Sequence, residues 1–248
     1  MIDGTIIRLT MRQLLGQKRT LLMLGFALIP VLIAVLYYFN GDHTRNDPQE
    51  WTAKVVLSGL VVGLTLPFTA LVFGTAALGT EFEDGTAVYL LSKPIPRSTI
   101  VLSKLLVAWL ATIVVVLIAT VPAGYIALSG KPADGIVLGF AIAVVAGALV
   151  YCSAFLWLSI ATSRALIAGL LYVFIWEGVV VNLFRGVRFF SVRQYTLGIA
   201  GELNSAPARV FDPRLDGPQA VILATVVTGV AIWFAFRALQ RWEIGEAS

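Results

Sequence analysis

One ionisable residue, Glu177, lies well inside a predicted membrane-spanning segment, in the sequence Trp176-Glu177-Gly178. A carboxylate at that depth is costly, so it is a candidate for contact with a proton or a transported molecule, facing a cavity or paired with a base. Arg185 and Arg188 follow further along the chain and are possible partners. The alternative is a glutamate at the outer end of its span, tied by hydrogen bonds to the segment that follows.

Other catalytic chemistry is scarce in this sequence. No G-x-x-x-x-G-K-[ST] phosphate loop occurs, so the chain by itself has no usual cradle for ATP. His43 is the single histidine, which excludes an H-E-x-x-H metalloprotease, and Cys152 is the single cysteine, which excludes an internal disulfide. We therefore expect no catalytic residue, no cofactor site and no metal site on this chain.

A cluster of apolar residues, Ala87 to Leu91, interrupts the charged stretch 79–97, which reads GTEFEDGTAVYLLSKPIPR. A loop that only faces water between two membrane spans has no need of such a cluster. The cluster favours a docking element for a separate soluble protein, bound by helix-in-groove recognition. The alternative is a short helix that packs only on the membrane ends of its own chain.

Local signals predict short helices within this stretch. Thr80 and Glu83 have the spacing of a capping box, which would start a helix at Thr80. Gly85 lets the backbone bend, and Thr86 can cap a second short helix. Two prolines forbid its continuation, Pro94 and Pro96.

The composition identifies an integral membrane protein. Of 248 residues, 58% are hydrophobic and 13% are charged, and the mean hydropathy is +0.89. Such a chain has too little polar surface to cover itself in water. The net charge is +4, but the basic residues are scattered at the ends of apolar blocks, which suits a lipid bilayer and not nucleic acid.

Six apolar blocks reach the roughly 20 residues that a helix needs to cross a hydrocarbon core. The expected spans cover residues 20–39, 55–78, 100–128, 136–161, 165–184 and 219–237. The sequence has no fixed-period repeat and no low-complexity tract. We therefore expect residues 1–248 to form a single membrane domain, with 238–248 as a cytosolic tail.

Basic residues predict the orientation, because cytosolic loops carry an excess of lysine and arginine. With the N-terminus inside, the first two outer loops hold Arg45, Lys54 and Lys131. The cytosolic side holds Arg8, Arg12, Lys18, Arg19, Lys93, Arg97, Lys104, Arg164, Arg237 and Arg241. The contrast predicts a protein of the cytoplasmic membrane, with both termini and the stretch 79–97 in the cytosol.

Residues 5–19 have the pattern of an amphipathic helix, because Ile7, Met11 and Leu14 recur at helical spacing while arginines mark another side. This length and charge suit a helix that lies in the interface plane of the membrane. The alternative is a basic cytosolic tail.

The outer segment 185–218 opposes the charge rule. It carries Arg185, Arg188, Arg193, Arg209 and Arg214. It also predicts a helix, because Ser191 and Gln194 have capping-box spacing and apolar residues then share one face. These residues are Val192, Tyr195, Ile199 and Leu203. We interpret the segment as a helix that dips into or lies on the outer interface, its arginines reaching headgroups. A mistaken span count is the alternative.

The second span has a polar side and a small-residue pattern. Ser58, Thr65 and Thr69 share one helical side, and Gly59 with Gly63 forms a small-xxx-small pattern that permits close approach of another helix. Such patterns are typical of packing within one chain. Nothing local distinguishes a threonine that faces a pore from one that is packed.

The charged stretch carries a longer pattern. It reads E-x-E-x-G-T from Glu81 to Thr86 and L-L-S-x-P-I-x-R from Leu90 to Arg97, with Lys104 in the next apolar block. This pattern resembles the permease subunits of type-2 ABC exporters. The resemblance covers the motif closely and the rest of the chain by its layout of spans.

In that family the loop is the coupling helix, which sits in a groove of the ATP-hydrolysing subunit. The resemblance implies that the docking residues are Glu81, Glu83, Gly85, Thr86, Val88, Leu90, Leu91, Pro94 and Arg97. In the same family the second and fifth spans of two permeases face each other and line the export path. Carried over to this chain, the lining would include Thr65, Thr69, Tyr172 and Trp176.

The resemblance also implies a fold and an assembly. The fold is an all-α membrane protein of six spans, with 5–19 as an elbow helix, a cytosolic coupling helix and a re-entrant outer segment at 185–218. The assembly pairs two permeases with two ATPase subunits, which would bind ATP and Mg. The cargo would be hydrophobic or amphiphilic, such as a drug, antibiotic, lipid or peptide, since the candidate path is apolar and aromatic.

Two other functions fit parts of the sequence. A proton-coupled secondary transporter would use Glu177 as its proton site and would need no ATPase. A membrane assembly or sensor subunit would bind an ATPase without moving cargo.

Overall fold

The computed structural model describes residues 9–11, 18–40, 47–83, 85, 96–129 and 135–241. In that part of the chain all regular structure is helical, and no strand occurs. Among these described residues, six helices are long and apolar enough to cross a membrane, as the sequence predicts. They cover Arg19–Asn40, Pro48–Gly79, Arg97–Ala127, Ile136–Ala161, Ala165–Leu183 and Gly217–Arg241. The chain is therefore an all-α, multi-pass membrane protein.

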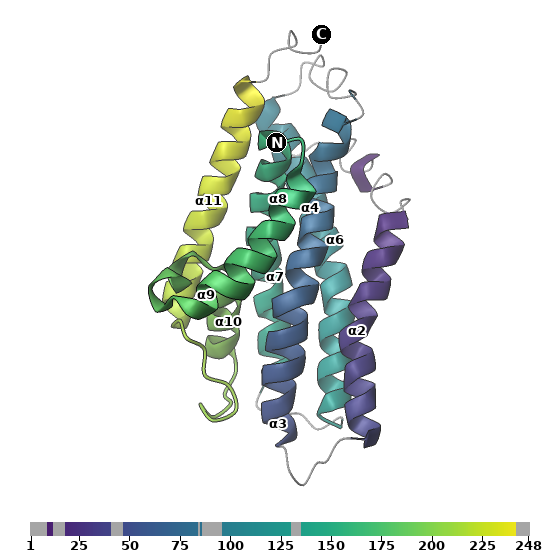
Figure 1. The fold of residues 1–248 in the computed structure, drawn as a ribbon, viewed down its shortest axis with the longest axis vertical. Coiled ribbons are helices and arrows are strands. Elements are labelled where there is room, and N and C mark those ends of the chain that lie inside the picture. The colour runs from purple at the N-terminus through teal and green to yellow at the C-terminus, as the bar shows by residue number, and fades with distance from the viewer. Residues whose placement is uncertain are drawn as a thin grey trace.

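Long helical rods stand side by side in the molecule, and the first of them in the chain forms one edge (Figure 1). They are built on α2 (Lys18–Asn40), α4 (Leu66–Glu83), α6 (Arg97–Ala127) and α7 (Ile136–Ala161). Helix α4 packs against α6 and α7, and α2 packs against α6. The α4 rod begins with α3 (Pro48–Trp51) and η1 (Thr52–Thr65).

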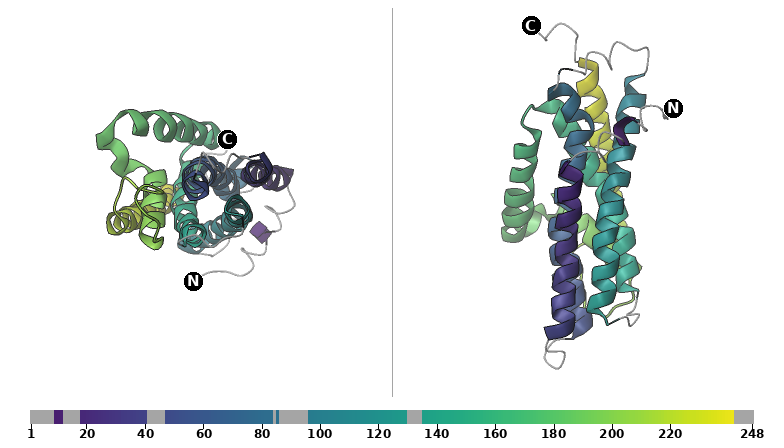
Figure 2. Two further views of the ribbon diagram at one scale, coloured as in Figure 1. Left: turned by 90° about the horizontal axis from the view of Figure 1, so that it is seen from below. Right: turned by 90° about the vertical axis from the view of Figure 1, so that its right-hand side faces the viewer.

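The second half of the chain packs against one side of this bundle. Figure 2 shows a fifth rod that leaves the bundle and ends beside the last helices. It consists of α8 (Ala165–Leu171), η2 (Tyr172–Val180) and α9 (Val181–Leu183). It leads into η3 (Arg185–Phe190), α10 (Val192–Leu203) and α11 (Gly217–Arg241). Helix α10 packs against both α7 and α11, so the outer segment is attached to the bundle.

Two of the rods, the second and the fifth spans, contain π-helical stretches with wider turns, η1 and η2. Two hydroxyl groups in η1 form hydrogen bonds with the five-residue spacing of this wider turn. The Oγ of Ser58 donates to the carbonyl of Ala53 at 2.6 Å, and Thr65 donates to Leu60 at 3.1 Å, in each case five residues back. Such stretches are frequent at functional sites, and these lie in the two spans expected to line a path.

Close approach between helices depends on small residues. A Cβ at Gly147 of α7 would lie 2.3 Å from Thr196 Oγ1 and 3.0 Å from Leu66 Cδ2. A Cβ at Gly198 of α10 would lie 2.7 Å from Ala220 Cβ. Because interiors are close-packed, these glycines fix how near α10 lies to α7 and α11.

Helix α10 has the start and the apolar face that the sequence predicts. Ser191 is its N-cap, and the serine Oγ accepts a hydrogen bond from the backbone N–H of Gln194 at 3.2 Å. Val192, Tyr195 and Ile199 are buried. Leu203 at its end is 45% exposed.

One predicted helix boundary is wrong. Thr80 does not start a helix, because α4 continues through it to Glu83. Ala76, Ala77 and Leu78 are good helix formers, and the helix continues past Gly79 into the charged stretch, so the capping signal is overridden. The predicted elbow at residues 5–19 lies mostly outside the described residues, and α2 begins at Lys18.

Candidate functional site

Glu177 reaches from η2 to the N-terminus of α10. Only 5% of its surface is exposed. The Oγ of Ser191 donates to Oε2 at 2.5 Å, and the backbone N–H of Val192 donates to Oε1 at 2.9 Å. The N–H of Arg193 is 3.4 Å from the same oxygen. A helix N-terminus has unpaired N–H groups and a partial positive charge, so a carboxylate there is stabilising.

Two tyrosines complete the surroundings of the carboxylate. Tyr172, one turn before it in η2, donates to Oε1 at 3.1 Å, and Tyr151 of α7 donates at 3.2 Å. The donors to Glu177 that the structure describes are hydroxyl and backbone N–H groups, and the predicted pairing with Arg185 and Arg188 stays a prediction. Glu177 ties the fifth span to α7 and to the outer segment.

Tyr195 closes the other side of this cluster. Its hydroxyl donates to the carbonyl of Phe189, at the end of η3. Burial, and then the nearby charge of Glu177, raise the pKa of Tyr195 to about 12. The hydroxyl therefore keeps its proton at neutral pH and remains a donor.

Arg193 points from α10 toward the second span. Its Nη2 donates to the carbonyl of Ser58 at 3.3 Å. A Cβ at Gly63 would lie 3.4 Å from the arginine Cζ. The absence of a side chain at Gly63 therefore leaves room for the guanidinium, which gives this end of the small-xxx-small pattern a packing role within the chain.

The predicted path residues occupy two environments. Thr65 and Thr69 are buried inside the chain, at 1% and 0% exposure. Tyr172 and Trp176 are half-buried, and the indole N–H of Trp176 donates to the carbonyl of Phe190 at 3.2 Å. The two threonines therefore pack against other parts of this chain, while the two aromatic residues reach its surface.

A cavity of about 160 Å³ joins the second and fifth spans. Its walls include Gly63 and Leu64 from the second span, and Phe174 and Glu177 from the fifth. Leu64 and Phe174 are 40% and 56% exposed. The exposed surface between these two spans is therefore lined by Leu64, which directly precedes the predicted path residue Thr65 in the chain, and by Phe174.

At the opposite end of the bundle, an ion pair joins α4 to α6. Lys104 Nζ lies 2.5 Å from Glu81 Oε1, and the two side chains are 1% and 14% exposed. A buried lysine is costly unless it is paired, so the position of Glu81 is constrained by Lys104. The predicted docking residue Glu81 therefore has a partner on the next span.

Arg97 lies at the start of α6, on the far side of the docking stretch. Its Nη1 donates to the carbonyls of Leu239 and Gln240, at 2.8 and 2.6 Å. These carbonyls are in the last turn of α11, where a cation complements the partial negative charge of the helix end. Both borders of the docking stretch are thus attached to the bundle.

Within the docking stretch itself the structure describes few residues. Glu83 ends α4, and Gly85 has a φ of 68°, a left-handed conformation that favours glycine. The bend predicted at Gly85 is present. The other predicted docking residues lie outside the described part of the chain: Thr86, Val88, Leu90, Leu91 and Pro94.

Tyr151 and Arg193 take part in the site but are not predicted by the sequence. Tyr151 lies in the middle of an apolar run, where an aromatic residue normally indicates core packing. Arg193 belongs to a segment whose arginines were assigned to lipid headgroups. For Ser191, the capping-box spacing predicts an N-cap, but it does not predict the hydrogen bond that Ser191 donates to Glu177.

A known protein family matches the part of the chain that contains these features. A family model described as ABC-2 family transporter protein matches residues 5–205, which include the docking stretch, the Glu81–Lys104 pair and Glu177. No curated protein matches the chain. The matched region is most of the chain and contains five of the six apolar helices. The chain therefore belongs to the ABC-2 transporter family, as a multi-pass permease component of an ABC transporter.

Proposed function

We propose that this chain is the membrane-spanning subunit of an ATP-driven exporter. Its family implies an ABC ATPase as partner, and its sequence has no phosphate loop. ATP and Mg²⁺ bind to the partner ATPase, and this chain carries no cofactor of its own. The permease contributes the path and the docking surface.

The observation that carries this proposal is the attachment of both borders of the docking stretch. Glu81 is held by Lys104 before the stretch, and Arg97 is held by the end of α11 after it. A force applied to residues between these borders passes directly into α4, α6 and α11. Such an attachment suits an element that transmits movement from a partner, since a loose loop would absorb the movement.

The assembly contains two permeases and two ATPase subunits. ATP binding closes the ATPases against each other, and the docking stretches then rock the two permeases by alternating access. The protein lies in the cytoplasmic membrane with both termini in the cytosol. The excess of basic residues on that side supports this orientation.

The cargo is hydrophobic or amphiphilic and leaves the cytosol between the second and fifth spans. The cavity beside Leu64 and Phe174 supports this location. Tyr172 and Trp176 lie at the chain surface there, and Thr65 and Thr69 join the path only if the second span rotates during the cycle. Substitution of Leu64 by Trp is therefore expected to reduce transport more than substitution of Thr69.

The two alternative functions, a proton-coupled transporter and an assembly or sensor subunit, make different predictions from an exporter. A proton-coupled transporter needs a carboxylate that exchanges its proton during each cycle, whereas Glu177 is engaged by several donors in this structure. An assembly or sensor subunit would bind the ATPase but would tolerate changes along the path.

The test of the docking proposal is co-purification with the ATPase. The chain is expressed together with an ABC ATPase encoded beside it, with Val88, Leu90 and Leu91 changed to Asp. We expect the ATPase to be lost from the purified complex, because three carboxylates oppose apolar contact in a groove. If the charged variant retains the ATPase, or the unchanged chain never binds it, the docking proposal fails.

A matched control is Ser163→Asp. Ser163 is exposed in the short turn between α7 and α8, at the same end of the molecule. This variant adds a charge at the same end of the bundle but at a position outside the docking stretch, so ATPase binding is expected to persist. Transport of a fluorescent amphiphile by complex in vesicles then separates an exporter from an assembly or sensor subunit.

A further inference from the structure

A polar hollow of about 230 Å³ lies where η1, α10 and the segment after α10 meet. It adjoins the cavity between the second and fifth spans, and the two share Asn182 and Arg193 in their walls. Ser58 and Gln194 line the hollow, whereas Leu64 and Phe174 form an apolar part of the cavity wall. A polar hollow therefore lies next to a cavity that has an apolar part.

The charged side chains in the wall of the hollow are mostly positive. Lys54, Arg193 and Arg214 line it together with a single carboxylate, Asp212. Asp212 and Arg214 are exposed at the rim, whereas Arg193 is half-buried. A half-buried guanidinium in a concave wall attracts anions more strongly than an exposed one, because water screens it less.

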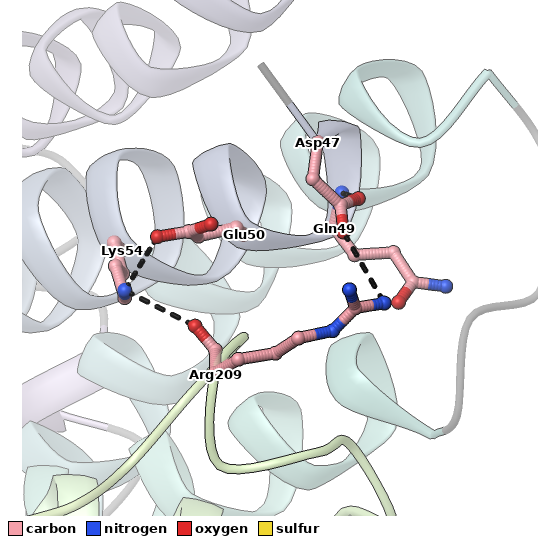
Figure 3. A network of polar contacts seen from close by, with 5 residues as sticks. All are labelled: Asp47, Gln49, Glu50, Lys54 and Arg209. Carbon is pink, nitrogen blue, oxygen red and sulfur yellow. Dashed lines mark hydrogen bonds and ion pairs between the residues drawn. The ribbon is translucent and has the colours of Figure 1, made fainter.

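Lys54 is already engaged. Its ammonium lies 2.6 Å from Glu50 and donates to the carbonyl of Arg209 at 3.2 Å, as Figure 3 shows. Asp47 lies 3.9 Å from the exposed guanidinium of Arg209. The two contacts of Lys54 hold the rim of the hollow, whereas the Asp47–Arg209 pair is long and exposed. Because Lys54 is engaged in this way, Arg193 is the half-buried cation in the wall that can bind a ligand.

Two buried polar atoms in the wall have no hydrogen-bond partner among the described residues. They are Arg193 Nε, a donor, and Gln194 Oε1, an acceptor. Gln194 is 5% exposed, and it stays in place because its backbone N–H bonds to the Ser191 cap. Leaving such atoms unpaired costs free energy, so adjacent examples in a concave wall indicate a binding site.

We propose that this hollow binds an anionic phosphate group that carries a neighbouring hydroxyl. The phosphate oxygens accept from the Arg193 guanidinium and the hydroxyl donates to the Gln194 amide oxygen, after the two side chains turn from the buried positions of Nε and Oε1 toward the hollow. The adjoining cavity beside Leu64 and Phe174 accommodates an apolar chain on the same ligand. The site therefore fits the headgroup of an anionic amphiphile, and free phosphate shares the same chemistry.

The role of this ligand as cargo rests on the proposed export function, but binding does not. Binding is measured on the purified permease in a neutral detergent, without an ATPase and without transport. The readout is the midpoint of thermal unfolding, since a ligand that binds the folded chain raises it. The probes are inorganic phosphate, dihexanoyl phosphatidylglycerol and dihexanoyl phosphatidylcholine, all at one ionic strength.

We expect phosphatidylglycerol to raise the midpoint by about 5 °C near saturation, and phosphatidylcholine to raise it far less. Phosphatidylglycerol has an anionic phosphate with glycerol hydroxyls, whereas the phosphocholine group is neutral overall and lacks a hydroxyl. A rise with phosphatidylglycerol but not with phosphate identifies a lipid headgroup as the source. A rise with both shows that free phosphate is sufficient.

Two variants place the effect in the hollow. Arg193→Gln is expected to raise the half-saturating concentration at least about tenfold, the loss of one charge-assisted hydrogen bond. The matched control is Arg209→Gln, which removes an exposed guanidinium, 78% accessible, from the same end of the molecule. This control is expected to bind like the unchanged chain.

Gln194→Leu separates binding from folding. Removal of a buried amide oxygen without a partner leaves the midpoint of the ligand-free chain equal or higher. The same change weakens phosphatidylglycerol binding, because its hydroxyl loses an acceptor. The proposal is overturned if no probe raises the midpoint, or if Arg193→Gln and Arg209→Gln respond alike. If the Gln194→Leu variant binds phosphatidylglycerol as tightly as the unchanged chain, the proposed contact between the ligand hydroxyl and Gln194 is wrong.

Discussion

At the scale of single residues, Glu177 shows how hydroxyl and backbone N–H groups stabilise a buried carboxylate. Its oxygens accept from hydroxyl groups and from the first N–H groups of α10. Ser191 serves twice, since it donates to Glu177 and accepts from Gln194. The cost of burying the charge is offset by hydrogen bonds and by the helix terminus.

The first prediction concerns Glu177→Gln. An amide nitrogen replaces one carboxylate oxygen, so one acceptor and the negative charge at the start of α10 are lost. We expect the folded chain to lose about 2 kcal/mol of stability. The measurement is the thermal unfolding midpoint in detergent, followed together with proteolysis of the segment after α10, which becomes easier to cleave.

The control for this variant is Glu50→Gln, the same chemical change in an exposed ion pair. Glu50 and Lys54 are 45% and 51% exposed, and exposed pairs contribute about 0–1 kcal/mol. An equal effect of the two variants would contradict the role given to Glu177. A proton-coupled transporter would instead lose proton dependence in Glu177→Gln without loss of stability.

At the scale of elements, the Glu81–Lys104 pair connects the second and third spans next to the docking stretch. The pair forms because α4 continues beyond Thr80, which brings Glu81 beside α6. If a new helix had started at Thr80, as the capping signal predicts, the chain direction would change before Glu81. Helical continuity therefore gives the docking residue Glu81 its partner on α6.

The second prediction is a double-mutant cycle on this pair. Lys104→Met leaves the Glu81 carboxylate without its lysine and is expected to cost about 3–5 kcal/mol. Adding Glu81→Gln removes the charge that lost its lysine, so the double variant is expected to be more stable than Lys104→Met alone. The midpoints of thermal unfolding of the four proteins give the coupling energy.

The cycle also has an outcome that contradicts the pair. If the double variant is no more stable than Lys104→Met, the lysine acts by packing and not through Glu81. The exposed pair Glu50–Lys54 is the comparison, and its cycle is expected to give a coupling energy below about 1 kcal/mol.

At the scale of the whole molecule, both ends of the bundle carry polar networks and the surface between them is apolar. One end holds Lys104 and Arg97, and the other holds Glu50 and Lys54. Exposed large apolar side chains lie along α2, α6, α8, η2 and α11. This distribution suits a bilayer around the six spans.

The third prediction fixes the orientation of the molecule. In a Cys152→Ala background, cysteine is introduced either at Glu50 or at Ser163, which lie at opposite ends of the bundle. A membrane-impermeant maleimide added to intact cells is expected to label the cysteine at position 50. The cysteine at position 163 reacts only after the membrane is opened, because the docking end faces the cytosol.

Labelling in the reverse order would place the docking stretch outside the cell and would remove the basis for ATPase binding. Labelling of both positions in intact cells would indicate mixed insertion. Cys152 itself is 0% exposed, so its replacement by alanine removes a background thiol without changing the surface.

Composition and periodicity determined most of the fold. Six long apolar blocks can be satisfied in a bilayer only as helices, so the spans follow from the sequence. The N-cap at Ser191 is equally local, because a serine followed by an amphipathic run bonds its own backbone. The pattern from Glu81 to Arg97 indicated the family because its residues are consecutive in the chain.

Only the tertiary structure decided which distant groups meet. The donors to Glu177 come from α7 and α10 as well as η2, and no spacing in the sequence encodes that meeting. The burial of Thr65 and Thr69, against the exposure of Leu64, depends on how the second span rotates within the bundle. The sequence puts Thr65 and Thr69 on one side of this span, but it does not say whether that side faces a neighbouring helix or a path, so packing between spans decides it.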